Sequence, residues 1–339
     1  MNDEMHQTHE TERERRLPQL SLDLPSCAFR QYPNNPPAST SAPRGGGEVR
    51  LSELERLAVL GRGNGGTVYK VAHRRTSALY ALKVLHRGDP DAAAEADAMR
   101  RAADSPHVVR LHDVIPAAAS GEVALLLELV DGGSLDALLV GGPGPFPEAA
   151  VAEVAAQALS GLAHLHARRV VHRDVKPANL LVSTNGEEVK IADFGIAKVV
   201  PSRAAGDHHH SCATYEGTAA YMSPERFDTE RYHDADPCAA DVWGLGVTIL
   251  ELLVGRYPLL PTGKKPTWAA LMCAICFGEP PALPDGVAAS PELRGFVAAC
   301  LHKDYTKRAS VAQLLAHPFI AGRDVAASKD ALRRLVTGA

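Results

Sequence analysis

The chain has 339 residues, a formal net charge of -4 and 45% hydrophobic residues. This length allows two lobes with tails around a sizeable core, and the mildly acidic balance excludes a global basic field for nucleic acid or acidic lipid. The first 20 residues are charged and polar, and the longest apolar runs, 123–130 and 245–254, are far shorter than the roughly 20 residues that span a bilayer. We therefore expect a cytoplasmic or nuclear protein with no nucleic-acid or membrane partner.

Residues 1–50 are rich in charge and then in Pro, Ser and Gly, a composition that predicts disorder. Within them, at 13–25, a basic cluster precedes alternating leucines. Such a pattern suits an extended peptide whose cations meet an acidic patch while its leucines enter apolar pockets, although a solvated tail would also fit. The residues concerned are Arg13, Arg15, Arg16, Leu20, Leu22 and Leu24.

The rest of the chain divides by periodicity into a β-rich part and a helical part. Residues 51–130 hold the short β-like runs 58–60, 68–71, 80–84 and 123–127, with one helical stretch near 91–103. After a Gly132-Gly133 bend, residues 131–321 carry helical patterns at 148–168, 241–254 and 291–301. Residues 322–339 form a tail that is either one more helix or frayed. The predicted fold class is α+β, with a small β-rich N-lobe and a larger helical C-lobe.

The first chemical motif is a glycine-rich turn between two β-like runs. Gly61, Gly63 and Gly66, followed by Val68, would let a hairpin lie close over phosphates with its backbone N–H groups facing the anion. Alone, this pattern could equally be an ordinary turn. A dinucleotide-binding interpretation needs a helix directly after the glycines, and a strand follows instead.

A lysine stands at the end of the next apolar run. Lys83 follows Ala81 by two residues, and a buried lysine there needs phosphate oxygens and a helix carboxylate as partners. Glu95 is the favoured carboxylate, with Asp91 and Asp97 close by in sequence. The alternative is a solvated lysine and an unrelated surface acid.

Two further motifs complete a set for phosphoryl transfer. The segment 172–179, His-Arg-Asp-Val-Lys-Pro-Ala-Asn, offers Asp174 as acceptor of a hydroxyl proton and Lys176 as positive charge. Asn179 and the Asp193 of Asp-Phe-Gly would hold metal. The ordered set, ending in Ser223-Pro-Glu, is specific for protein kinases and predicts ATP and Mg²⁺ as cofactors.

Residues 54–321 resemble the eukaryotic protein kinase domain and, within it, the MAP-kinase kinases. The narrower resemblance lies in Gly-Thr-Ala-Ala-Tyr-Met-Ser-Pro-Glu-Arg at 217–226 and Asp-Gly-Gly-Ser-Leu at 131–135, while 271–278 resembles the plant members. It implies a dual-specificity kinase that phosphorylates Thr and Tyr of a MAP kinase and is activated by an upstream MAP-kinase kinase kinase. The basic-leucine segment would be its docking site. Separately from the resemblance, we expect a monomer.

The resemblance also implies roles for single residues. The hinge Glu128 to Val130 would bind adenine through its backbone, with Leu127 as gatekeeper, and Thr218 would contact Asp174. Glu225 would pair with Arg308, and Asp241 would anchor the catalytic loop. The hydrophobic spine of the active state would be formed by Met99, Leu111, His172 and Phe194.

The activation loop departs from the family. Plant members carry two acceptors in an S/T-x5-S/T arrangement; here the second position is Thr214, but the first is His208. The animal-type spacing also fails, because it falls on His210. Our hypothesis is that phosphate on Thr214, aided by Ser211, suffices and binds Arg173.

Two other functional classes remain open at this point. A near-silent kinase that holds MAP kinases as a scaffold would fit the irregular activation loop, although the catalytic residues argue against it. An upstream serine/threonine kinase is the second, and the Ser-Pro-Glu segment and the docking tail argue against that.

Cysteine and histidine patterns are interpreted as structural. The six cysteines have no framework spacing and are expected to be reduced thiols. Cys273 and Cys276 lie in an apolar helical stretch, 268–277, and are expected to be buried by packing. The run His208-His209-His210 is expected to be an exposed loop rather than a metal site.

Overall fold

The computed structural model describes residues 49–338 except 64–65, 86–91, 118–121, 201–218, 229–230, 233 and 261–266. These residues belong to one compact unit, Ser39–Ala339. Several predictions lie outside the described residues: the docking segment 13–25, the run 208–210, Ser211, Thr214 and Thr218. In the described part, no helix is long and apolar enough to cross a membrane.

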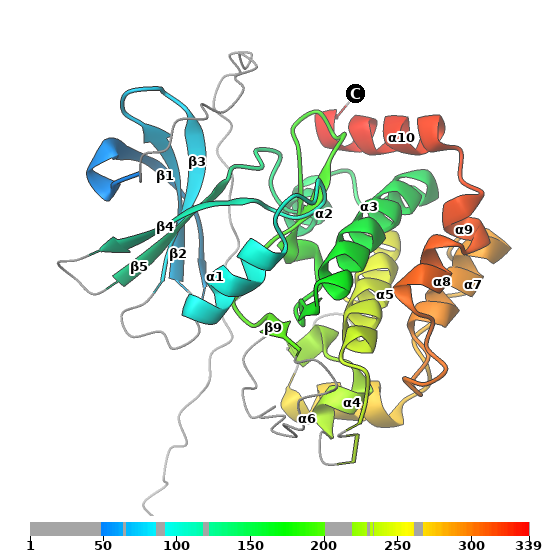
Figure 1. The fold of residues 1–339 in the computed structure, drawn as a ribbon. Helices are drawn as coiled ribbons and strands as arrows, with labels where there is room; N and C mark the ends of the chain where they lie inside the picture. Colours follow the sequence, from blue (N-terminus) through cyan, green and yellow to red (C-terminus); the bar gives the residue numbers. More distant parts are fainter. Residues whose placement is uncertain are drawn as a thin grey trace, which may run out of the picture. The chain divides into compact units, whose positions relative to one another are not determined.

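The N-lobe is a five-stranded antiparallel sheet in the order β1-β2-β3-β5-β4 (Figure 1). A small core of six buried side chains lies on it: Leu54, Val71, Leu82, Ile115, Ala124 and Leu126. A short 3₁₀ turn, Leu51–Glu53, precedes the first strand, and helix α1 joins the main core through Ala96 and Met99. The elements are β1 (Leu54–Gly63), β2 (Gly66–His73), β3 (Leu79–Val84), α1 (Ala92–Arg101), β4 (Leu111–Ala117) and β5 (Glu122–Glu128).

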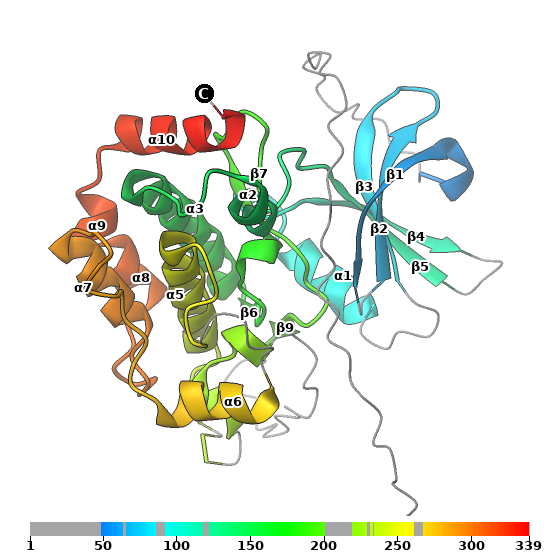
Figure 2. The same cartoon turned by 180° about the vertical axis from the view of Figure 1, so that it is seen from behind.

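The C-lobe is built around two long buried helices, α3 (Glu148–Ala167) and α5 (Cys238–Val254), which lie side by side in both views (Figures 1 and 2). Both are apolar almost all round, which is typical of helices that are covered on every side. The other helices are α2 (Leu135–Gly141), α4 (Pro224–Phe227), α6 (Trp268–Met272), α7 (Pro291–Cys300), α8 (Val311–Leu315), α9 (Pro318–Ala321) and α10 (Val325–Thr337).

Two short strand pairs carry the chemically interesting loops. β6 (Val170–Val171) pairs with β9 (Lys198–Val199), and β7 (Leu180–Val182) pairs with β8 (Val189–Ile191). The single-turn helices η2 (Pro177–Asn179) and η3 (Ala219–Tyr221) and the π turn η4 (Cys273–Phe277) complete the structure. The predicted α+β, two-lobed fold class is confirmed.

The predicted helices are present with small boundary differences. The stretch expected at 241–254 begins three residues earlier, at Cys238, and the one expected at 91–103 is Ala92–Arg101. The 322–339 segment forms helix α10, capped by the Asp324 side chain on the amide of Ala327 (3.1 Å).

The expectation of two buried cysteines in the 268–277 stretch is wrong. Cys273 is exposed and Cys276 is half-buried, because the inward face of this segment is formed by Leu271 and Ile275. All four described cysteines, the other two being Cys238 and Cys300, are free thiols, as expected.

The β7–β8 turn packs closely against α10, and Gly186 makes this possible. Its φ is +68°, and a Cβ there would lie 2.6 Å from the Cα of Arg333. Gly186→Ala is expected to lower the free energy of unfolding by about 2–3 kcal/mol, adding a packing clash to a left-handed backbone. Gly133→Ala is the control, because Gly133 also has a left-handed φ (+83°) but has open space around it. Urea unfolding measures both, and equal losses would contradict a tight α10 contact.

Candidate active site

A buried lysine joins two acids at the centre of the site. Lys83 Nζ donates to Glu95 Oε1 of α1 at 2.7 Å and to Asp193 Oδ1 at 2.8 Å. The predicted pairing of Lys83 with Glu95 is therefore present in the structure. Burial alone would lower the pKa of Lys83, but Asp193 and Glu95 outweigh it and raise the pKa. The lysine is thus held as a cation, ready to face anionic oxygens.

The pKa of Asp193, the aspartate of the Asp-Phe-Gly motif, is shifted in the opposite direction to that of Lys83. The Asp193 side chain is 49% exposed. Partial desolvation opposes its charge, but Lys83, followed by Lys176 and His172, holds the pKa of Asp193 below its ordinary value. Asp193 also has a left-handed backbone, φ +63°. An ionised carboxylate in a strained loop, beside a fixed cation, is a typical arrangement for a functional site.

The catalytic loop brings three predicted side chains together. Lys176 Nζ donates to Asp174 Oδ2 at 2.7 Å, and Asn179 Nδ2 donates to the same oxygen at 2.9 Å. Asn179 Nδ2 also donates to the backbone carbonyl of Asp174 at 2.9 Å. The carboxylate therefore has a fixed orientation and a neighbouring positive charge.

Asp241 anchors this loop from α5, as predicted. Its carboxylate is fully buried and accepts from the amides of His172 (2.9 Å) and Arg173 (2.7 Å), and it contacts His166 Nε2 at 2.8 Å. Burial would raise the pKa of Asp241, but His166 and the other donors hold it below its ordinary value.

Part of the predicted hydrophobic spine is visible as contacts. The His172 and Phe194 rings meet edge to face at 5.1 Å, and His172 Nε2 lies 3.0 Å from the carbonyl oxygen of Ala192. Met99 and Phe194 are buried in the same core, against which the half-buried Leu111 packs.

The strand register places the predicted nucleotide-binding residues around Lys83. Val68 lies opposite Lys83 in the β2–β3 pair, and Ala81 lies opposite Leu127 in the β3–β5 pair. Val130 packs, half-buried, against the main core after β5 ends at Glu128.

The three glycines of the first hairpin are constrained differently. Gly61 pairs with Val68, Gly63 pairs with Gly66, and an added Cβ at Gly61 or Gly63 would meet nothing within 4 Å. At Gly66, with φ +133°, a Cβ would lie 2.1 Å from the carbonyl oxygen of Val84. Gly66 is therefore required by the sheet itself, whatever the hairpin binds.

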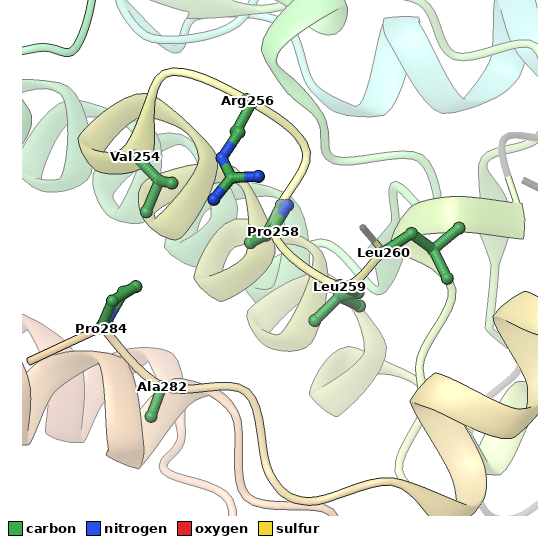
Figure 3. Close-up of a pocket in the computed structure, with 7 residues that line it drawn as sticks. All are labelled: Val254, Arg256, Pro258, Leu259, Leu260, Ala282 and Pro284. Carbon is green, nitrogen blue, oxygen red and sulfur yellow. The ribbon is translucent and has the colours of Figure 1, made fainter. Parts of the chain in front are cut away.

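The hinge is fixed by a contact that the sequence did not indicate. Glu128 Oε1 accepts from Lys190 of β8 at 2.5 Å, and its backbone N–H donates to the carbonyl of Arg110 at 2.9 Å. A pocket of about 360 Å³ lies beside this pair and is also lined by Asp104 and His112. A second, of about 300 Å³, lies between the end of α5 and the segment with Ala282 and Pro284 (Figure 3). Neither is lined by Lys83, Asp174 or Asp193.

The predicted pair behind the substrate side of the site is confirmed. Arg308 meets the Glu225 carboxylate through both terminal nitrogens, at 2.6 and 2.9 Å, and both side chains are buried. Arg308 also donates to the carbonyls of His302 and Ala239. Glu225 is the second residue of α4, so the pair fixes the end of the 217–226 segment against the C-lobe.

A second set of hydrogen bonds, which was not predicted, holds the 217–226 segment against the C-lobe. The hydroxyl of Tyr221 donates to Glu251 of α5, and the hydroxyl of Tyr257 donates to the carbonyl of Ala220 (2.6 Å). Burial raises the pKa of Glu251 to about 7, although the Tyr221 bond lowers it and nearby Asp136 raises it. The acid is thus largely protonated in the folded protein at pH 6.

Stability should consequently depend on pH through Glu251. Because its folded pKa is about 7 against 4.5 for a free carboxyl, the wild type should lose stability relative to Glu251→Gln as pH rises from 4.5 to 7. The loss is on the order of 3 kcal/mol, set by the size of that shift. Urea unfolding of both proteins at pH 5 and pH 7.5 measures it. If the difference in unfolding free energy between wild type and variant were the same at both pH values, the pKa of Glu251 would not be raised in the folded protein.

Comparison with known proteins places these groups in a family context. The family model described as the protein kinase domain matches residues 54–320. The chain is 47% identical to mitogen-activated protein kinase kinase 9 of Arabidopsis thaliana over 315 residues, covering 91% of this chain and 97% of the relative. It is 45% identical to mitogen-activated protein kinase kinase 7 of the same plant over 310 residues (90% and 94%). A more distant relative, protein kinase wis1 of Schizosaccharomyces pombe, is 36% identical over 281 residues (80% and 44%).

Proposed function

Since the chain belongs to the protein kinase family and, within it, to the mitogen-activated protein kinase kinases of the plant type, we propose that it transfers the γ-phosphate of ATP to Thr and Tyr in the activation loop of a MAP kinase. The observation that carries the proposal is the assembled site. Lys83 is held between Glu95 and Asp193, and Asp174 is held by Lys176 and Asn179.

The residues divide the chemistry among them. Asp174 accepts the proton of the substrate hydroxyl, whose oxygen forms a bond to the γ-phosphorus as the bond to the ADP oxygen breaks. Lys176, 2.7 Å from Asp174, supplies positive charge beside the transferring group. Lys83 faces the ATP phosphates, and the hinge backbone from Glu128 to Val130 binds adenine. For Thr218, which lies outside the described residues, the family resemblance implies a contact with Asp174 near the acceptor.

The donor set fits Mg²⁺. Asp193 provides an ionised carboxylate, and the amide nitrogen of Asn179 is used by Asp174, so its amide oxygen is the atom offered to a cation. When bound, Mg²⁺ neutralises charge on the phosphates.

The partners follow from the same proposal. The chain acts as a monomer, and the basic-leucine segment 13–25 docks the MAP kinase. An upstream kinase activates the chain by phosphorylating Thr214, and phosphorylation of Ser211 aids this activation. Phosphate there would be received by Arg173, whose amide is already fixed by Asp241.

The test is an in vitro reaction with Mg-ATP and a kinase-dead MAP kinase, followed by mass spectrometry of the substrate's activation loop. We expect phosphate on both Thr and Tyr. Replacement of Leu20, Leu22 and Leu24 by Ala should raise KM for the MAP kinase with little change in kcat. Phosphate on Ser or Thr alone would contradict dual specificity. Binding through the leucines without any transfer would point to the scaffold.

A further inference from the structure

The guanidinium of Arg226 reaches the catalytic loop from outside it. Arg226 is the third residue of α4, and its Nη1 donates to the backbone carbonyl oxygen of Arg173 at 2.6 Å. A charged donor at this length makes a strong hydrogen bond. The carbonyl belongs to the peptide unit that joins Arg173 to Asp174, so its oxygen is three covalent bonds from the Cα of Asp174.

The backbone around that peptide unit is strained and is held by several hydrogen bonds. Arg173 has a left-handed backbone, φ +69°, which is costly for a residue with a Cβ and persists only where its surroundings fix it. The amide of Arg173 donates to Asp241 Oδ1 at 2.7 Å, and the amide of Asp174 lies 3.3 Å from His172 Nδ1. The carbonyl between these amides is the group that Arg226 fixes.

The element that carries Arg226 is itself immobilised. Its neighbour Glu225 is locked by the two-pronged pair with buried Arg308, and Phe227 packs on Trp268 with ring centroids 4.7 Å apart. Because α4 is held in place on both sides of Arg226, the position of the guanidinium and the geometry of its hydrogen bond are well defined.

We propose that Arg226 is a positioning residue for the phosphoryl-transfer reaction. It holds the Arg173–Asp174 peptide so that the Asp174 carboxylate stays in place, and it thereby couples the end of the activation segment to the catalytic base. The inference rests on the proposed function, since it concerns the same site. Without the guanidinium, the left-handed turn at Arg173 loses its carbonyl anchor and the Asp174 carboxylate samples other positions.

The test compares Arg226→Met with a matched control, Arg294→Met. Arg294 also donates to backbone carbonyls, those of Leu283 (3.2 Å) and Val287 (2.6 Å), but in the C-lobe away from the catalytic loop. We expect Arg226→Met to lower kcat about 10- to 100-fold, the size of effect that a small misplacement of a catalytic group produces, with KM for ATP within about two-fold. Arg294→Met should leave kcat within about two-fold.

Two more readouts separate positioning from general destabilisation. Hydrogen exchange in the fragment 170–180 should be faster in Arg226→Met than in Arg294→Met. Arg226→Lys, which keeps a charged donor, should regain part of the lost kcat. If Arg226→Met does not fold, kcat and hydrogen exchange are measured on Arg226→Gln instead.

Failure of the Arg226 proposal and failure of the proposed function give different experimental results. If the wild type transfers phosphate and Asp174→Asn does not, the proposed function stands. With that established, a kcat within two-fold of wild type in the Arg226 variants, or an equal loss in Arg294→Met, would overturn the positioning role. A wild type without transfer would overturn the proposed function instead, and unchanged exchange at 170–180 would still overturn the inference about Arg226.

Discussion

Replacing Lys83 by Met is expected to lower kcat/KM by about two to three orders of magnitude, the size of loss found when a charged group that stabilises a transition state is removed. The same change should destabilise the fold. Glu95, whose side chain is 4% exposed, would lose its nearest cation, and breaking a buried pair costs about 3–5 kcal/mol. Steady-state kinetics and urea unfolding measure the two effects separately.

The double variant Lys83→Met/Glu95→Gln is the matched control for that result. Removing the glutamate charge as well should restore much of the stability, because the buried Glu95 carboxylate is no longer left without its cation. Asp193 also loses Lys83, but its side chain is 49% exposed and can be solvated. It should not restore activity, since the cation is still missing. Recovery of transfer in the double variant would show that Lys83 acts only as a structural partner of Glu95.

Arg308→Met is expected to have the largest effect on stability in the C-lobe, about 3–5 kcal/mol, because it leaves the buried Glu225 carboxylate without its partner. Two carbonyls, those of His302 and Ala239, would lose a donor as well. Thermal or urea unfolding measures the loss. The control is Arg333→Met, because Arg333 pairs with Asp330 on the surface and such pairs contribute about 0–1 kcal/mol.

A second variant separates charge burial from packing at that pair. Arg308→Met/Glu225→Leu removes both charges and should recover part of the stability lost in the single variant. A single-variant loss below about 1 kcal/mol would mean that the pair is solvated in solution and does not fix α4.

Most of the secondary structure, and the site residues that lie within short sequence motifs, could be predicted from the sequence. The β-rich and helical parts follow from periodicity, and Lys83, Asp174, Asn179 and Asp193 were recognised because their residue types and spacing match the needs of phosphoryl transfer. The long-range pair Glu225–Arg308 was predicted only through the resemblance to kinases, since nothing local links residues 83 positions apart.

Several contacts could not be predicted from residue order. Arg226 to the Arg173 carbonyl, Tyr221 to Glu251, and Gly186 against Arg333 each depend on how separate elements pack together. A weak signal existed for Arg226, because it directly follows the Ser-Pro-Glu motif. The error at Cys273 has a similar cause: a short apolar helix does not reveal which of its faces turns inward.

The most direct test of the central claim is the transfer of labelled γ-phosphate from Mg-ATP to a kinase-dead MAP kinase by the wild type and by Asp174→Asn. Asn is nearly isosteric with Asp, so the fold should be retained, and thermal unfolding checks this. We predict transfer by the wild type and a loss of about 10²- to 10⁴-fold in kcat for the variant, the contribution of a general base. Equal transfer by both proteins would contradict the assignment of Asp174 and with it the proposed chemistry.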